Sequence, residues 1–196
     1  LTAALVRRGL AVQPFKVGPD YLDPTHLERA AGRAARNLDT WLLTPAMVRR
    51  VFLQAGRAAE LSLIEGVMGV FDGYGAASER GSTAEVAKLL KTPVILVVDA
   101  SHMARSVAAM VKGYREFDAD LPIAGVILNR VSERHAQLLR ESLRATVDVP
   151  VLGYLPAEPA VAIPERHLGL IPAQEAASLD GRVERLARLI ETTVDL

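Results

Sequence analysis

Charged side chains cluster directly after an apolar, strand-like run near the start of the sequence. Lys16 lies at the end of the run 12–17, and Asp20 and Asp23 follow it. In an open parallel sheet, ligands bind beyond the carboxyl ends of the strands. A lysine there can reach a phosphate, and two carboxylates can hold Mg²⁺ or orient a substrate group. For Asp23 the stronger alternative is structural, because Asp-Pro-Thr is typical of a helix start with Asp23 as its N-cap; Asp20 is left open between the two roles.

A second acidic group closes another apolar run. Glu65 ends the run 61–65 and is followed by a glycine-rich segment that contains Asp72. A carboxylate that ends a buried strand beside a phosphate site commonly binds Mg²⁺, directly or through water. The glycines and the Asp72-Gly73 dipeptide are equally typical of plain turns. Turn chemistry explains the loop, but it does not explain the acid at the strand end.

Asn129 follows a third apolar run, 123–128. Its amide can donate and accept hydrogen bonds, as the edge of a purine ring requires, although asparagine is also an ordinary turn residue. The four histidines show no metal-ligand spacing and no H-E-x-x-H helix, and no G-x-S-x-G elbow supports a serine nucleophile. The candidate chemistry therefore rests on carboxylates, a lysine and an amide.

The elements that must position these groups alternate along the chain. Apolar runs predict strands at 12–17, 61–65, 93–99, 123–128 and 149–154, and helical periodicity predicts helices at 45–55 after an N-cap at Thr44, 82–90, 102–117, 132–143 and 181–192. Residues 156–172 contain four prolines and predict an ordered loop. This order is typical of an α/β protein with a parallel sheet covered by helices on both faces.

Composition excludes several classes of protein. The 196 residues are 50% hydrophobic, with 23 basic and 23 acidic side chains and hence a net charge of zero. We therefore expect no nucleic acid or membrane partner, since both require a positive field. The chain has no cysteine and no apolar run near the ~18–20 residues that span a bilayer, which favours a cytoplasmic protein.

The start of the chain looks like the inside of a helix. Leu1, Ala4 and Leu5 have helical spacing and Gly9 is a stop signal, yet no capping residue precedes them. We expect a strand, a phosphate-binding loop and the first helical residues to precede Leu1 in a nucleotide-binding α/β protein.

Six motifs together resemble the cobyrinic acid and hydrogenobyrinic acid a,c-diamide synthase family. They are KVGPDYLDP (16–24), RNLDTWLL (36–43), EGVMGVFDG (65–73), ASHMARS (100–106), GVILNRV (125–131) and IPERHLGL (163–170). The resemblance covers nearly the whole chain in the right order. It implies a P-loop-type α/β fold similar to dethiobiotin synthetase. It also implies an ATP-dependent amidoligase of cobalamin biosynthesis, which activates the a and c acetate carboxylates of a corrinoid as acyl phosphates.

The resemblance also implies roles for individual residues. Lys16 would neutralise the transferring phosphoryl group, Glu65 with Asp20 would hold Mg²⁺, and Asn129 would face the adenine of ATP. The substrate carboxylate would meet the γ-phosphate among Asp20, Tyr21, Asp23 and Asp72, and Arg166 and His167 would lie near the macrocycle. The implied partners are the corrinoid polycarboxylate and a glutaminase domain as ammonia source. A homodimer is left open, because the sequence does not determine the oligomeric state.

The sequence differs from the family pattern in two ways, and alternative functions are also compatible with it. The family's phosphate loop would precede Leu1 and its glutaminase domain would follow Leu196, so we expect this chain alone to be inactive. A diamide synthase for nickel-sirohydrochlorin, or a non-catalytic P-loop ATPase that binds partner proteins, would share much of the pattern. Four arginines near the site loops are candidates to pair with substrate carboxylates, or else ordinary solvated residues: Arg29, Arg33, Arg36 and Arg80.

Overall fold

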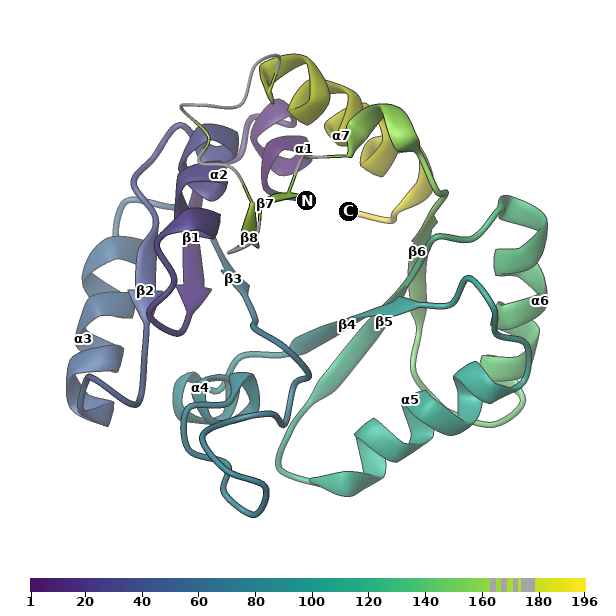
Figure 1. The fold of residues 1–196 in the computed structure, drawn as a ribbon, viewed down its shortest axis with the longest axis horizontal. Helices are drawn as coiled ribbons and strands as arrows, with labels where there is room; N and C mark the ends of the chain where they lie inside the picture. Colours follow the sequence, from purple (N-terminus) through teal and green to yellow (C-terminus); the bar gives the residue numbers. More distant parts are fainter. Residues whose placement is uncertain (163–164, 167–168, 171–172, 174–178) are drawn as a thin grey trace. The chain divides into compact units, whose positions relative to one another are not determined.

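The chain divides into two compact units, each built on a three-stranded parallel sheet (Figure 1). The computed structural model describes residues 1–162, 165–166, 169–170, 173 and 179–196. The first unit comprises Leu1–Leu90 and Val161–Ala187, and the second comprises Lys91–Ala160 and Arg188–Leu196.

Strand β1 (Val12–Val17) is the centre of the first sheet, between β2 (Arg36–Leu38) and β3 (Leu61–Glu65). All six residues of β1 are buried, as expected of a central strand covered on both faces. Both neighbours run parallel to β1, and the register places Lys16 opposite Glu65 of β3. The two charged groups are therefore adjacent near the carboxyl ends of their strands.

Helices cover both faces of this first sheet. Phe15 and Val17 pack into a core with Val48 of α3 (Pro45–Gly56) and Val86 of α4 (Thr83–Leu90), and the ring of Phe15 lies 5.1 Å from that of Phe52. Since successive side chains of a strand face opposite sides, Lys16 faces the other layer. That layer contains α1 (Thr2–Arg7) and α2 (Leu22–Ala31), both in contact with β1.

The second sheet has the order β4-β5-β6, formed by β4 (Val94–Asp99), β5 (Ile123–Asn129) and β6 (Val151–Leu155). Its central strand buries Val126, Ile127 and Leu128. Helices α5 (Ser106–Phe117) and α6 (Glu133–Arg144) pack together, and α6 begins after Ser132, whose hydroxyl accepts a hydrogen bond from His135 N–H. The end of α7 (Leu179–Thr193) leads to Val194, which bridges to Gly153 of β6.

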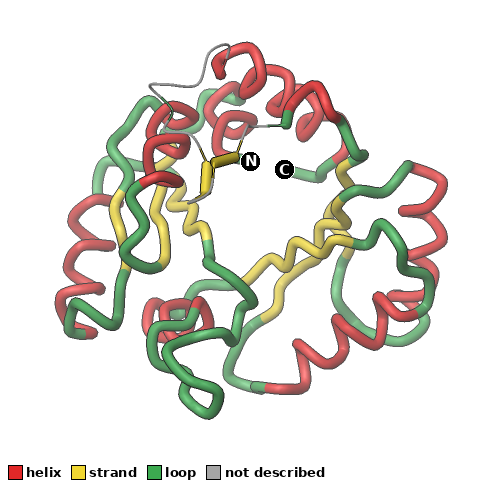
Figure 2. Tube along the Cα trace, in the orientation of Figure 1, coloured by secondary structure: helices red, strands yellow, loops and turns green. Residues whose placement is uncertain are grey.

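The proline-rich segment contains short elements that we did not predict. A 3₁₀ turn, η1, spans Pro159–Val161, and β7 (Glu165–Arg166) pairs antiparallel with β8 (Gly169–Leu170). Figure 2 shows these pieces among loops, together with the long loop that joins β3 to α4. Within the described residues, no helix is long and apolar enough to cross a membrane.

The predicted parallel α/β architecture is confirmed, and the five predicted strands lie within two residues of their observed bounds. The predicted N-cap at Thr44 is also confirmed, since its hydroxyl accepts a hydrogen bond from Met47 N–H. Helix α5 begins at Ser106, later than predicted, because turns occupy residues 101–102 and 105. The short edge strand β2 was missed, since three residues carry too little periodicity to be recognised.

Phe15 and Phe117 offer a matched test of this core. Phe15 is fully buried and Phe117 is 75% exposed. We expect Phe15→Ala to lower the free energy of unfolding by about 3–5 kcal/mol, since it leaves a cavity between β1 and α3. Phe117→Ala should change it by less than about 0.5 kcal/mol. Urea unfolding followed by circular dichroism measures both values, and equal losses would contradict the assignment of the core.

Candidate functional site

The ammonium group of Lys16 is the centre of the candidate site. Only 4% of its side chain is exposed. Its Nζ lies 2.7 Å from Asp23 Oδ2, 3.2 Å from Glu65 Oε1 and 3.0 Å from the carbonyl oxygen of Gly66. A lysine has three N–H donors, so these contacts use all of them. Lys16 thereby joins β1 to the first turn of α2 and to the end of β3.

The surroundings raise the pKa values of both Lys16 and Glu65, for different reasons. Burial opposes the charge of Lys16, but the hydrogen bond to Asp23 and the charges of Glu65 and Asp23 outweigh it and raise the pKa of the lysine. Partial burial raises the pKa of Glu65, and the neighbouring Lys16 offsets only part of that rise. Lys16 is therefore firmly protonated at neutral pH, while Glu65 holds its proton more readily than an ordinary glutamate.

The side chain of Asp20, not that of Asp23, binds the first N–H groups of helix α2, whose N-cap residue is Tyr21. The helix begins at Leu22, and Asp20 accepts hydrogen bonds from Leu22 N–H at 2.8 Å and from Asp23 N–H at 3.3 Å. The expectation that Asp23 is the N-cap is therefore wrong: with Asp20 satisfying the first N–H groups, the carboxylate of Asp23 is left to bind Lys16. Burial works against ionisation of Asp20, but these backbone hydrogen bonds prevail and lower its pKa.

Asn37 is a site residue that the sequence reasoning missed. Its side-chain amide donates to the carbonyl oxygens of Gly18 and Asp20, at 2.8 and 2.6 Å. These bonds hold the loop after β1 against β2. The sequence offers Asn37 only as part of the RNLDTWLL motif (36–43), which assigns it no role.

The acidic groups fit a magnesium ion only in part. Among the described residues, no group of three or more His, Asp or Glu side chains could hold a metal. Mg²⁺, however, usually takes one or two carboxylates together with water and substrate phosphates. Glu65 fits this pattern, since 45% of its side chain is exposed and only one of its oxygens accepts from Lys16. Asp20 fits less well, because both of its oxygens already accept backbone N–H groups.

The remaining candidates are more scattered. Asp72 accepts a hydrogen bond from Gly69 N–H in its own loop and has no bond to Lys16 or the other acids among the described residues. Tyr21 is 76% exposed at the start of α2. Asn129 belongs to the second unit, where its side-chain oxygen accepts from Arg130 N–H. Arg166 lies in β7, and His167 falls outside the described residues.

Three of the four candidate arginines bind the protein itself. Arg29 pairs with Asp180, Arg33 donates to the carbonyl oxygen of Ala58, and Arg36 donates to that of Ala35. Arg80 differs from them. Its guanidinium carbon lies 4.7 Å from the centre of the Trp41 ring, and no carboxylate of the described residues pairs with it.

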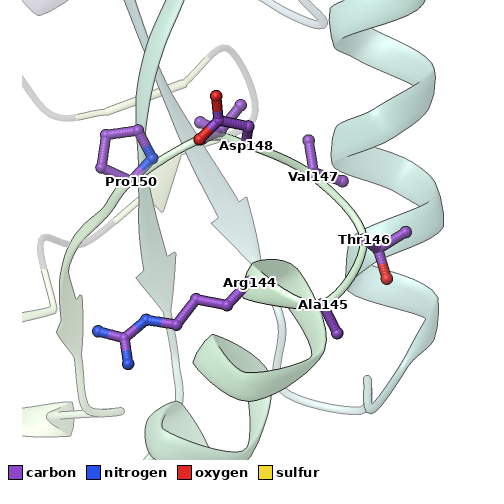
Figure 3. A pocket seen from close by; sticks show the side chains of 7 residues that line it. Arg144, Ala145, Thr146, Val147, Asp148 and Pro150 are labelled. Carbon is purple, nitrogen blue, oxygen red and sulfur yellow. The ribbon is translucent and has the colours of Figure 1, made fainter.

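Two pockets lie away from the Lys16 contacts. Arg33 and Arg36 line one with Gln13 of β1. Figure 3 shows the other, which residues 144–150 line between the end of α6 and the start of β6. It therefore precedes β6, whereas ligands of parallel sheets bind after the strands. We assign neither pocket to the candidate site.

Comparisons with known proteins agree with the sequence motifs. Residues 1–171 match the CobQ/CobB/MinD/ParA nucleotide binding domain family. The chain is 51% identical over 195 residues to cobyrinate a,c-diamide synthase of Listeria innocua, covering 98% of this chain and 43% of that protein. It is 52% identical over 179 residues to hydrogenobyrinate a,c-diamide synthase of Streptomyces coelicolor, covering 91% and 37%. The resemblance to these synthases is thus confirmed, and the chain spans less than half the length of these relatives.

A solved structure supports the fold. The signal recognition particle 54 kDa protein from Aeropyrum pernix, crystallised with GDP, matches with a TM-score of 0.51 at 19% identity, covering 97% of this chain and 44% of that one. At this identity the likeness speaks for the fold alone. Together with the family match, it confirms the expected P-loop-type α/β class.

Replacing Lys16 by Met tests its role as the shared partner of two carboxylates. Because its pKa is raised, the stabilisation that Lys16 provides is complete below the ordinary lysine value of 10.5 and is lost as the pH rises through the raised value. We expect Lys16→Met to lower the free energy of unfolding at pH 7 by about 3 kcal/mol. Part of this loss should be regained as the pH falls towards 4.5, since Glu65 takes up a proton without its cation.

Urea unfolding at pH 5 and 7 measures the expected loss and its partial recovery. Lys112→Met is the control, because the exposed Lys112 lies 3.6 Å from Glu116 in a surface pair that contributes little. A Lys16→Met protein as stable as the control at every pH would show that Lys16 does not hold the site together.

Proposed function

Since this chain belongs to the CobQ/CobB/MinD/ParA nucleotide binding domain family, we propose that it is the ATP-using part of a cobyrinate or hydrogenobyrinate a,c-diamide synthase. The proposed enzyme is a ligase of cobalamin biosynthesis that converts two acetate carboxylates of a corrinoid into amides. The observation that carries the proposal is the Lys16, Asp23 and Glu65 cluster at the carboxyl edge of a parallel sheet. Relatives named as these synthases, at 45–52% identity over most of the chain, support it.

The proposed reaction follows from the chemistry of a carboxylate. A carboxylate resists attack by ammonia, because it is negatively charged and lacks a good leaving group. One of its oxygens therefore attacks the γ-phosphorus of ATP, and the bond from that phosphorus to the bridging oxygen of ADP breaks. Ammonia then attacks the acyl phosphate carbon, inorganic phosphate leaves with the bonding electrons, and the nitrogen loses a proton. Each amide consumes one ATP and one ammonia.

In this proposal the acidic groups bind and the lysine positions them. Glu65 would hold Mg²⁺, which when bound neutralises charge on the phosphates. Because all three N–H groups of Lys16 bind protein oxygens, we now assign it to orienting Asp23 and Glu65 rather than to touching phosphate. Asp20 fixes the loop that carries Tyr21 toward the substrate. The other proposed contacts are Asp72 at the substrate carboxylate, Asn129 at the adenine, and Arg166 and His167 at the macrocycle.

The ammonia is proposed to come from glutamine. Glutamine hydrolysis by a thiol needs a cysteine nucleophile, and this chain contains no cysteine. We therefore propose that a separate glutaminase domain supplies the ammonia. Added ammonium salt should replace glutamine in the synthetase assay.

The test uses a chimera, because the chain covers 43% of the Listeria innocua relative. This chain replaces the matching segment of that enzyme, and the product is assayed with cobyrinic acid, Mg·ATP and ammonium chloride. We expect ATP-dependent formation of the a,c-diamide, detected by mass spectrometry with one ADP released per amide. Glu65→Gln should lower kcat by about 10²–10³, as expected when one electrostatic contact to the reacting phosphates is lost.

Glu116→Gln is the matched control, since it removes an exposed glutamate charge in the second unit. It should leave kcat unchanged. An active chimera whose rate is equally insensitive to Glu65→Gln would refute the role of Glu65, and a folded chimera that hydrolyses ATP but amidates neither cobyrinic nor hydrogenobyrinic acid would refute the proposed function.

A further inference from the structure

An exposed aromatic stack lies on the first unit, apart from the Lys16 contacts. The rings of Trp41 and Tyr74 are stacked, with centres 4.3 Å apart and planes 21° from parallel. The guanidinium of Arg80 lies over the Trp41 ring. Tyr74 is 71% exposed and the neighbouring Leu42 is 68% exposed. Contiguous exposed apolar side chains of this kind mark binding surfaces more often than scattered ones do. We call Trp41, Tyr74 and Arg80 the aromatic platform.

Hydrogen bonds hold the tryptophan loop of the platform in place. Asp39 accepts from Trp41 N–H at 2.9 Å, and Thr40, which is 5% exposed, donates its hydroxyl to Glu85 of α4. The same carboxylate oxygen of Glu85 accepts from Gly81 N–H at 2.7 Å, next to Arg80. One half-buried acid, Glu85, therefore fixes both the tryptophan and the arginine parts of the platform.

The tyrosine loop closes tightly on itself. Tyr74 N–H donates to the carbonyl oxygen of Arg80 at 2.8 Å, and Gly75 and Ser78 form an antiparallel bridge. Gly73 must be small here, because a Cβ would lie 2.5 Å from that same carbonyl oxygen. Tyr74 is thus exposed on an ordered loop. Because the loop is already ordered, a ligand that binds the ring would lose little additional conformational entropy in the loop.

The platform and the Lys16 cluster lie at the same edge of one sheet. Trp41 follows the end of β2, and Tyr74 follows the end of β3, both of which run parallel to β1. The loop that carries Tyr74 and Arg80 starts at Gly66, whose carbonyl oxygen accepts from Lys16. A ligand bound on the platform would thus lie on the side of the sheet where Glu65 ends β3.

The chemistry of the platform selects a flat ligand with negative edges. Aromatic faces stack on conjugated rings, and an arginine lying on an aromatic ring keeps its in-plane N–H groups for a carboxylate. We propose that the aromatic platform binds the conjugated macrocycle of the corrinoid, with Tyr74 against its face and Arg80 on a peripheral carboxylate. This inference rests on the proposed function and names where that substrate binds.

The test measures binding of cobyrinic acid to the full 196-residue chain by equilibrium dialysis, read from the visible absorbance of the corrinoid. Tyr74→Ala and Arg80→Gln should each raise Kd about tenfold, while Tyr74→Phe keeps the ring and should bind like the unaltered chain. Phe117→Ala is the matched control, because it removes an equally exposed ring in the other unit. Trp41 is the only tryptophan, so the tryptophan fluorescence reports on the platform alone. Binding of cobyrinic acid should quench it by more than the inner-filter effect, which is measured with free N-acetyltryptophanamide.

The outcomes separate this inference from the proposed function. If the unaltered chain binds cobyrinic acid and Tyr74→Ala and Arg80→Gln bind it equally well, the platform is refuted and the proposed function stands. If these variants instead weaken the binding of Mg·ATP and leave the binding of cobyrinic acid unchanged, the platform binds the base of the nucleotide. That result overturns the inference. If the folded, unaltered chain binds no corrinoid, the inference is overturned, and the amidation assay of the chimera decides the proposed function separately.

Discussion

The structure of the candidate site depends on the need to satisfy one buried positive charge. An ammonium group removed from water costs several kcal/mol unless it is paired and hydrogen-bonded. Lys16 meets this need with two carboxylates and a carbonyl oxygen drawn from α2, β3 and the loop after β3. The first unit therefore cannot keep its lysine buried unless these three segments are in register. Only one oxygen of Glu65 accepts a hydrogen bond from Lys16 in this arrangement.

Around Lys16 and its partners, the loop after each strand of the first sheet contributes different side chains. The loop after β1 presents Asp20 and Tyr21 at the start of a helix, and the loop after β2 presents Trp41. The loop after β3 presents Tyr74 and Arg80. A parallel sheet brings these loops to one edge although they are far apart in sequence, which is the general reason why such sheets bind ligands there.

The sequence predicted the strands well, because long apolar runs report burial on both faces, as for β1 and β5. It also identified Lys16, Asp23 and Glu65 as candidate site residues, since each lies at or after the end of such a run. It favoured Asp23 as the helix cap, which is wrong, because the helix begins one residue before Asp23 and its first N–H groups donate to Asp20. The stack of Trp41 on Tyr74 joins residues 33 positions apart (74 − 41), and nothing in local composition points to it.

The complete burial of β1 has a consequence for motion in the site. Amides of a central strand exchange with solvent only when a whole unit opens, whereas those of exposed loops exchange through small local fluctuations. Lys16 and its carboxylates are therefore anchored to the slowest-exchanging part of the first unit, while the loop from Gly66 to Gly81 is largely exposed. Lys16 and β1 are therefore the fixed reference from which the hydrogen-bonded loop after β3 presents Tyr74 and Arg80.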